Sequence, residues 1–263
     1  MLILVVAVFA PVVAPHDPGT SGTLDITRRL RPPLGWGGEH GYLLGTDALG
    51  RDILSRILYG ARVSLAVGAL AVLLSGGLGV TLGLVAGYWK GWADDAIMRA
   101  GDIQLAFPFV LLAIAVMAVL GPSLVNLVLV LAIGSWVTYA RMVRSQVLEI
   151  REREFVLAAR ALGIATPRLL LRHVLPSATA PIIVVASYSA ANVILTEALL
   201  SFLGLGVDPT VPAWGSMVAE GRDYIRDAWW LTAFPGLAIA LTVLSINIVG
   251  DWLRDYMDPR LRV

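Results

Sequence analysis

The chain has 263 residues, 57% of them hydrophobic and 15% charged, with a formal net charge of +1 at pH 7. Soluble domains are about 45 to 50% apolar and about 25% charged, so the composition excludes an ordinary water-soluble globule. The near-zero net charge gives no support for nucleic-acid binding, and the absence of cysteine excludes disulfides, thiolate nucleophiles and cysteine metal sites.

Six apolar stretches approach or exceed the roughly 20 residues that a helix needs to cross a bilayer. They predict an all-α, polytopic membrane protein with about six transmembrane helices in one transmembrane domain over residues 1–263. The first stretch is the shortest and begins without a charged flank, which favours a late start codon or a trimmed N-terminus. The six stretches are Met1–Pro15, Val63–Tyr88, Gln104–Leu120, Ser123–Tyr139, Pro181–Leu205 and Trp230–Val249.

Lys and Arg gather on the cytoplasmic side of membrane proteins, so their distribution predicts the orientation of the chain. With a cytoplasmic N-terminus, the inner connections hold twelve basic residues and the outer ones eight, and seven of the twelve are the arginines from Arg141 to Arg172. We therefore expect the connection 16–62 outside and the connection 141–180 in the cytoplasm. Aromatic residues near several helix ends are expected in the headgroup layer, namely Tyr88, Trp89, Trp92, Trp136, Tyr139, Trp229 and Trp230.

The outer connection ends in a segment from Gly45 to Arg62 with the pattern of an amphipathic helix. Asp47 is expected to be its N-cap, and an apolar stripe follows, formed by Ile53, Leu54, Ile57 and Leu58. This pattern predicts a helix that lies at the membrane interface. A phosphate or metal loop and contact with a soluble protein are the alternatives.

Small residues in the second apolar stretch indicate where another helix packs. Gly79, Gly83 and Gly87 recur every four residues, so all three share one helical face. Because glycine has no side chain, a neighbouring helix can approach that face closely.

The connection 141–180 carries ten charges and yet keeps a helical apolar spacing. One face is formed by Phe155, Ala158, Ala159 and Leu162, at positions i, i+3, i+4 and i+7. Gly163 then ends the helix, because it adopts positive φ without steric strain. Thr166 and Pro167 suit the N-cap and first position of a second helix.

The second helix is expected to end at Pro176, with an apolar side formed by Leu170, Leu171, Val174 and Leu175. The product is a hairpin of two helices outside the membrane. An exposed apolar stripe usually requires a partner. The alternative is that the hairpin lies along the bilayer with its arginines facing lipid phosphates.

Polar residues interrupt the fifth apolar stretch. Measured from Pro181, Asn192 lies about 16 Å along the helix and Glu197 about 24 Å, with Thr196 between them. An ionisable group at that depth marks a transport pathway or a buried pair, so Glu197 is expected to act at a gate or to pair with an arginine of a partner subunit. The following outer loop, 207–228, has mixed charge and is expected to face water or to dock a soluble protein.

The stretch Glu154-Phe-Val-Leu-Ala-Ala-Arg-Ala-Leu-Gly163, continued by His173-Val-Leu-Pro176, resembles the cytoplasmic loop of ABC importer permeases. The family pattern is Glu-Ala-Ala, three residues, Gly, nine residues and Ile-x-Leu-Pro. The matching residues are Ala158, Ala159, Gly163, Leu175 and Pro176. Two positions depart from it, because Leu157 stands where the family has Glu and His173 where it has Ile.

Further segments resemble one branch of that family, the dipeptide, oligopeptide and nickel permeases, in the second of their two paired permease subunits. The resemblance covers nearly the whole chain. Its segments are Gly45–Arg56, Thr196–Gly206, Ala213–Gly215, Gly250–Asp255 and Asp258–Arg260.

The resemblance implies an ABC type I importer permease fold with a cytoplasmic coupling-helix hairpin. It implies that Glu154, Ala158, Ala159, Gly163, Leu175 and Pro176 belong to the loop that couples to the ATPase. Asn192, Thr196 and Glu197 are the candidate pathway residues. No catalytic residue, metal site or cofactor is expected in this chain, and ATP and magnesium are expected on partner subunits.

The implied partners are a paralogous permease subunit in a heterodimer, two P-loop ATPase subunits, a soluble substrate-binding protein and membrane lipid. The implied location is the inner membrane of a prokaryote, and the implied cargo is a dipeptide or oligopeptide, with nickel or another small solute as the alternative. Hydrolysis of ATP by this chain is not expected, because no Gly-x-x-x-x-Gly-Lys-Ser/Thr run occurs.

A secondary carrier and an intramembrane enzyme are the alternative classes of function. A carrier driven by protons or sodium usually has several embedded ionisable residues or repeated halves, whereas here Glu197 is the one clear embedded acid. An intramembrane enzyme needs a Ser/Lys, paired Asp or His/Glu constellation at helical depth, and none is apparent. Both classes fit the sequence less well than an importer permease.

Overall fold

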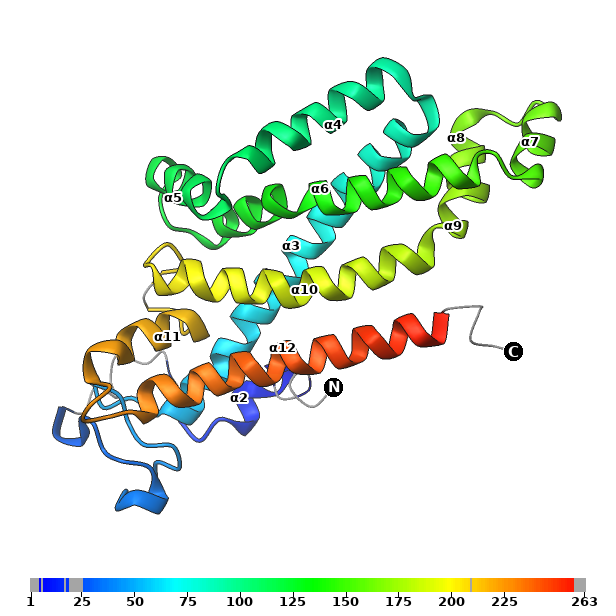
Figure 1. The fold of residues 1–263 in the computed structure, drawn as a ribbon. Helices are drawn as coiled ribbons and strands as arrows, with labels where there is room; N and C mark the ends of the chain where they lie inside the picture. The colour runs from blue at the N-terminus through cyan, green and yellow to red at the C-terminus, as the bar shows by residue number, and fades with distance from the viewer. Residues whose placement is uncertain (1–4, 6, 17, 19–25, 209, 258–263) are drawn as a thin grey trace. The chain divides into compact units, whose positions relative to one another are not determined.

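The computed structural model describes residues 5, 7–16, 18, 26–208 and 210–257. Regular structure within them is helical, apart from one isolated antiparallel bridge between Thr46 and Asp52. The principal helices, drawn in Figure 1, are α2 (Ala10–Val13), α3 (Ile53–Trp89), α4 (Gly91–Ala106), α5 (Phe109–Leu120), α6 (Leu124–Ile150), α7 (Glu154–Ala161), α8 (Thr166–Leu169), α9 (Leu175–Ser177), α10 (Thr179–Phe202), α11 (Trp214–Gly221) and α12 (Trp230–Met257). Short 3-10 helices are η2 (Ile26–Arg28), η3 (Leu34–Trp36) and η5 (Arg222–Tyr224), and η4 (Leu170–Val174) is a π-helix.

Four described helices are long and apolar enough to cross a membrane, namely α3, α6, α10 and α12. The pair α4 and α5 raises the number to five if it is counted as one broken span. The all-α, multi-spanning class is therefore confirmed. The first expected span, Met1–Pro15, lies partly outside the described residues, and within it the structure has α2.

The single helix expected over Gln104–Leu120 is wrong. The chain bends by 88° between α4 and α5, where Phe107 has extended backbone angles of φ −97° and ψ 134°. Pro108 accounts for the break, because proline has no N–H to donate and pushes the preceding residue out of the helical region.

The separate interfacial helix expected over Gly45–Arg62 is also replaced by a different arrangement. Ile53 begins α3, a continuous helix of 37 residues. Its N-cap is Asp52 rather than Asp47, because the Asp52 Oδ2 atom accepts from the backbone N–H and the hydroxyl of Ser55, at 2.9 and 2.5 Å. An N-cap side chain satisfies N–H groups of the first turn that have no partner within the helix.

The chain divides into two compact units, each assembled from distant segments. The first unit comprises 1–70, 113–128 and 192–245. Its core gathers buried side chains of α3, α11 and the start of α12, including Ile53, Ala61, Trp214, Met217, Ala228, Trp230 and Leu231. This core holds α11 in place, since the Trp214 indole also donates to the carbonyl of Ile57 at 3.0 Å.

The second unit comprises 71–112, 129–191 and 246–263. One core of this unit joins α3, α6 and the connection after α6 through Leu84, Val143, Val147, Ile150, Val156, Ala159, Leu169, Leu170, Val174 and Ala178. The predicted close packing at Gly79, Gly83 and Gly87 is confirmed, because a Cβ atom on each would lie 2.4 to 2.7 Å from the nearest atom of α6. These glycines let α3 and α6 pack with almost no gap.

Candidate functional site

The connection between α6 and α10 forms the predicted hairpin. Helix α7 ends in a paired hydrogen-bond pattern, in which Gly163 N–H donates to the Arg160 carbonyl at 2.9 Å and Ile164 N–H to the Ala159 carbonyl at 3.2 Å. Gly163 has a φ of +77°, in the region that favours glycine. This is the Schellman arrangement, so the turn expected at Gly163 is confirmed.

The second arm starts one residue earlier than predicted. Ala165 is the N-cap of α8, with Thr166 in its first turn, and the hydroxyl of Thr166 makes no capping bond. Pro167 is tolerated one position further into the helix because the N–H groups of the whole first turn lack partners within the helix.

A π-helix in the second arm was not predicted. Helix η4 forms where Leu175 N–H donates to the carbonyl of Leu170, five residues back. Pro176 follows at once and supplies no N–H, so the carbonyl of Arg172 has no regular α-helical donor. Proline was the available signal, since local widening of a helix commonly accompanies such a loss.

The hairpin buries different side chains from those predicted. Val156 and Ala159 of α7 pack into the core of the second unit, whereas Phe155 and Leu162 are 43% and 82% exposed. In the second arm, Leu169, Leu170 and Val174 are buried and Leu171 is 64% exposed. An outward apolar surface therefore remains on the hairpin, formed by Phe155, Leu157, Leu162 and Leu171.

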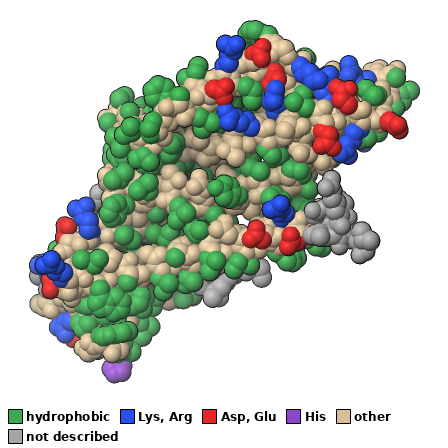
Figure 2. Space-filling model, in the orientation of Figure 1, with side chains coloured by type: hydrophobic (Ala, Val, Ile, Leu, Met, Phe, Trp, Pro, Cys, Tyr) green, Lys and Arg blue, Asp and Glu red, His purple; other side chains and the backbone are tan. Residues whose placement is uncertain are grey.

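The residues that resemble the ATPase-coupling loop divide between this surface and the core. Glu154, Ala158, Gly163 and Pro176 are exposed, Leu175 is half-buried and Ala159 is buried. Gly163 forms the turn, whereas Glu154 begins α7 and Pro176 lies in α9 at the other end of the second arm. Ala159 packs α7 against the core. Figure 2 shows charged side chains gathered over α4 and the hairpin.

Ion pairs fasten the end of α6 that carries the hairpin. Arg144 donates to both carboxylate oxygens of Asp94 in α4, with Nη2 2.6 Å from Oδ2. Arg151 Nη1 donates to the carbonyl of Tyr88 at 2.6 Å. Sequence reasoning treated these arginines only as markers of orientation and missed their partners.

The three candidate pathway residues of α10 do not share a face. Glu197 is fully buried and accepts from the Ser201 hydroxyl at 2.7 Å. Its Oε2 atom and the Ser64 hydroxyl of α3 are also buried and have no hydrogen-bond partner among the described residues. Asn192 is exposed and Thr196 half-buried, and the Thr196 hydroxyl donates to the Asn192 carbonyl at 2.8 Å.

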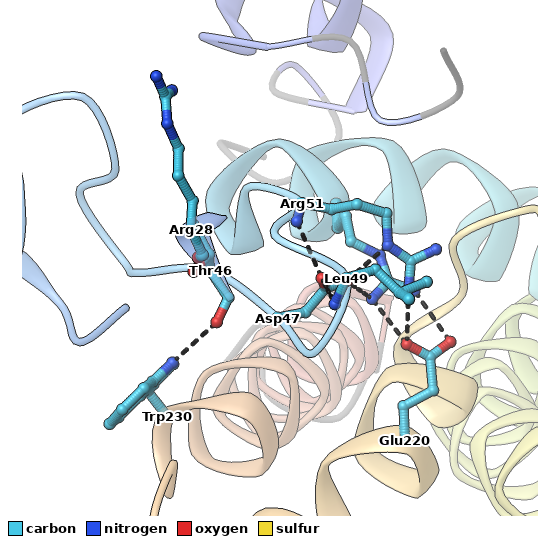
Figure 3. A network of polar contacts seen from close by, with 8 residues as sticks. Arg28, Thr46, Asp47, Leu49, Arg51, Glu220 and Trp230 are labelled. Atoms are coloured by element: carbon cyan, nitrogen blue, oxygen red, sulfur yellow. Dashed lines mark hydrogen bonds and ion pairs between the residues drawn. The ribbon is translucent and has the colours of Figure 1, made fainter. Parts of the chain in front are cut away.

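Segment 45–56 builds a buried polar cluster in the first unit (Figure 3). The Arg56 side chain is 3% exposed, and its Nη1 atom lies 2.7 Å from Asp47 Oδ2 and 2.7 Å from Glu220 Oε2. Arg51 Nε contacts the same oxygen of Asp47 at 2.6 Å. Trp230 is buried and donates to the carbonyl of Thr46 at 3.3 Å, so its indole packs against protein.

The outer loop 207–228 is only partly solvated as expected. Glu220 is drawn into the cluster around Arg56, whereas Arg222 and Asp223 are paired at the surface. Thr210 donates its hydroxyl to Asp208 at 2.6 Å and its N–H at 2.8 Å, and these bonds hold the pKa of the Asp208 carboxyl below its usual value.

The geometry of the spans and hairpin agrees with a comparison against protein families. The model described as "Binding-protein-dependent transport system inner membrane component" matches residues 79–263, which include α6, the hairpin, α10 and α12. The chain belongs to this family. As a binding-protein-dependent transport component with several apolar helices, it is a multi-pass protein of the bacterial inner membrane.

Relatives of this transport component match it along its whole length. The di/tripeptide transport system permease protein DppC of Pseudomonas aeruginosa is 48% identical over 264 residues, covering 100% of this chain and 86% of that protein. The dipeptide transport system permease protein DppC of Alkalihalophilus pseudofirmus is 45% identical, covering 98% and 83%.

The same fold occurs in solved transporters. A chain of the MetNI methionine ABC transporter, in an inward-facing conformation, matches with a TM-score of 0.64 and 18% identity, covering 78% of this chain and 98% of that one. The expected ABC type I importer permease fold is thereby confirmed for this transport component.

Proposed function

We propose that this chain is the permease subunit of an ATP-driven importer of short peptides, and that it moves substrate without catalysing a reaction itself. The observation that carries this proposal is the hairpin between α6 and α10, which combines a rigid core with an uncovered apolar surface. The peptide cargo is inferred from full-length relatives named as dipeptide and di/tripeptide permeases.

Two ATPase subunits of the P-loop class are proposed to bind the hairpin, and they hold the ATP and magnesium. Leu162 and Leu171, which are 82% and 64% exposed, supply the apolar contact. Ala158 and Gly163 keep the turn narrow enough to enter a groove, and Glu154 adds a charge at the start of α7. Leu175 and Pro176 join this arm to α10, so a displacement of the hairpin is transmitted to that helix.

The hairpin has the packing that such transmission requires. Val156 and Ala159 are buried against the end of α6, and Leu169 and Val174 are buried in the same core. Close-packed protein interiors deform little, so the hairpin and the ends of α3 and α6 are proposed to move as one body. Bilayer docking, the alternative, would use the exposed Arg160, Arg168 and Arg172 of the hairpin, since Arg151 is engaged with the carbonyl of Tyr88.

The exposed side of α10 is proposed to face the transport pathway and a paralogous permease subunit in a heterodimer. Asn192 and Thr196 lie on that side with Leu195 and Leu199, which are 48% and 43% exposed. An amide and a hydroxyl there offer hydrogen bonds to passing peptide groups. A soluble substrate-binding protein is proposed to deliver the peptide from outside and to supply most of the selectivity.

Glu197 is proposed to act on the gate from within, because its side chain faces α3 rather than the exposed side of α10. Its Oε1 atom accepts from the Ser201 hydroxyl, whereas its Oε2 atom and the Ser64 hydroxyl of α3 are both buried without a hydrogen-bond partner among the described residues. A buried carboxyl oxygen without a hydrogen-bond donor is costly, so a conformation of the protein that brings a donor to it is favoured. Movement of α10 against α3 changes whether a hydrogen-bond donor reaches the Glu197 carboxyl.

Reconstitution tests the function. The chain is placed in proteoliposomes with its partner permease, both ATPase subunits and the binding protein, and uptake of radiolabelled dialanine is measured with and without ATP. We expect uptake that requires ATP and all subunits, and competition by other di- and tripeptides but not by nickel. Uptake driven by a proton or sodium gradient without ATP would contradict the importer class, and ATP-driven uptake of nickel alone would contradict the cargo.

A further inference from the structure

A groove of about 370 Å³ lies between the first turns of α10 and the last turns of α12. Among the described residues that line it, one is charged, Arg254, and six are apolar, namely Met142, Ala180, Pro181, Val184, Val185 and Met257. Figure 2 shows the surface hollowed between α10 and the C-terminal half of α12. The groove is therefore lined mostly by apolar side chains, with one charged side chain.

A close helix contact closes one end of the groove. A Cβ atom on Gly250 of α12 would lie 2.8 Å from the Cβ of Ser187 in α10. The two helices touch there because glycine offers no side chain. Beyond this contact α12 continues to Met257, and the side chain of Met142 from α6 forms part of the groove wall.

The charge in the groove has no ion-pair partner in the part of the chain that the structure describes. Arg254 is exposed, lies in the last turn of α12 and forms no ion pair with the described residues. At 100° per residue, Gly250, Arg254 and Met257 share one face of α12. Asp251 and Asp255 are exposed to one side of that face and are not part of the groove lining.

Aromatic residues indicate the depth of these turns in the membrane. Trp252 and Tyr256 stack on another side of α12 with ring centres 5.5 Å apart, and they are 62% and 60% exposed. Exposed indole and phenol rings favour the headgroup layer. Arg254 lies between them in the sequence and is therefore level with lipid phosphates.

The position of the groove next to the start of α10 indicates in which membrane leaflet it lies. Ala180 and Pro181 are in the first turn of α10, directly after the hairpin that we propose to bind the ATPase subunits. That side of the membrane is the cytoplasmic one, where anionic lipids attract arginine.

We propose that this groove binds one anionic phospholipid of the cytoplasmic leaflet. The phosphate lies on the Arg254 guanidinium, whose planar fork of donors matches phosphate oxygens. An acyl chain lies along Val184, Val185 and Met142. The lipid covers apolar surface that would otherwise be in contact with the more polar headgroup layer and fixes the spacing of α10 and α12.

Native mass spectrometry of the full chain, purified with its partner subunits, tests the site. Phosphatidylglycerol and phosphatidylcholine are supplied at equal concentration in detergent micelles. We expect preferential retention of phosphatidylglycerol, reduced about tenfold by Arg254→Ala, because the substitution removes the hydrogen-bond donors for the phosphate; tenfold corresponds to about 1.4 kcal/mol. Arg99→Ala is the matched control, because Arg99 is also exposed and has no ion pair among the described residues, and it leaves retention unchanged.

A second variant separates the apolar part of the site from its charge. Ala180→Trp fills the groove, and we expect it to abolish retention of either lipid while Arg254 stays in place. In addition, Val184→Cys supplies the only cysteine of the chain, and we expect it to crosslink to a phosphatidylglycerol that carries a thiol-reactive acyl chain. Equal retention of both lipids, no effect of Arg254→Ala, or no lipid adduct at position 184 would each overturn the proposal.

Discussion

Arg56 and Glu220 are joined by two hydrogen bonds although 164 positions separate them in the chain. Arg56 Nη1 lies 2.7 Å from Glu220 Oε2, and Arg56 Nη2 lies 3.0 Å from Oε1. The fork-to-fork geometry fixes the orientation of both side chains. It fastens α11 to the first turns of α3, and the buried carboxylate of Asp47 on the other side of Arg56 completes the cluster.

Replacing Arg56 with alanine is expected to destabilise the protein by about 3 kcal/mol. The substitution leaves Asp47, which is 1% exposed, with Arg51 as its remaining cation, and removal of one partner of a buried ion pair typically costs about 3 to 5 kcal/mol. The value is placed at the lower end because Arg51 still pairs with Asp47. Thermal unfolding of the purified protein in detergent measures the change.

Arg222→Ala is the matched control. The Arg222–Asp223 pair is nearby in the chain but 69% and 75% exposed, and surface pairs contribute about 0 to 1 kcal/mol. Equal loss of stability in the two variants would show that burial of Arg56 has no energetic consequence.

Two glycines of α3 provide a test of helix packing on one helix. A Cβ atom at Gly83 would lie 2.7 Å from the carbonyl oxygen of Ala140 and 2.8 Å from the Cβ of Val143, whereas at Gly77 it would meet nothing within 4 Å. We expect Gly83→Ala to destabilise by about 1 to 3 kcal/mol through overpacking. Gly77→Ala is expected to be neutral or to stabilise by up to about 1 kcal/mol, because alanine favours helix. The free energy of unfolding of both variants is measured with denaturant or by heating. If Gly83→Ala is the more stable of the two, close packing of α6 at Gly83 does not limit the size of the side chain there.

Features with a local cause were predictable from the sequence. The turn at Gly163 follows from one residue that tolerates positive φ, and the packing face of α3 follows from the spacing of three glycines. The helical type of the spans was predictable because hydrocarbon requires continuous apolar helix. Their number was not, because six were expected and the described residues contain four, or five with the broken pair α4 and α5. The break before Pro108 was equally local, and the rule that proline disfavours a helical residue before it would have found it.

Features that depend on distant partners were not predictable. The spacing of Phe155, Ala158, Ala159 and Leu162 defines a helical face, but which face is buried depends on where α6 and α3 end. The structure buries Val156 instead of Phe155 because α7 packs on Val147 and Ile150. Periodicity already places Asn192 and Glu197 about 140° apart on α10, but it does not say which of the two faces is buried, since it gives the angle between two side chains and not the identity of the neighbour.

Gly163→Val is expected to abolish ATP-driven uptake while the protein still inserts in the membrane. Valine is strained at a φ of +77°, and nothing lies within 4 Å of the glycine, so the change acts on the backbone turn and not on packing. Gly163→Asn is the control, because asparagine visits this region more readily. Uptake and membrane yield are measured together. Normal uptake by the valine variant would contradict a coupling role for the turn.

Leu162→Glu tests the outward surface of the hairpin. Leu162 is 82% exposed, so the substitution is expected to change stability by less than about 0.5 kcal/mol. A carboxylate there is costly to bury in an apolar groove, and co-purification of the ATPase subunits is therefore expected to fall about tenfold or more. Glu152→Ala, also exposed and close in the chain, serves as the control. Undiminished co-purification of the Leu162→Glu variant would remove this surface from the ATPase contact.

Substitutions in α10 separate a pathway role from an internal one. Asn192→Ala removes an amide from an exposed side, so we expect peptide uptake to fall several-fold with no change in the unfolding temperature. Glu197→Ala removes a fully buried side chain bonded to Ser201, and we expect destabilisation by about 1 to 3 kcal/mol together with loss of uptake.

Glu197→Gln retains the shape and an acceptor for the Ser201 hydroxyl, and it is expected to restore the unfolding temperature. If Glu197→Gln restores stability but not uptake, the carboxyl group itself is required at the gate. If Asn192→Ala destabilises the protein as much as Glu197→Ala does, the exposed side of α10 has a structural rather than a transport role.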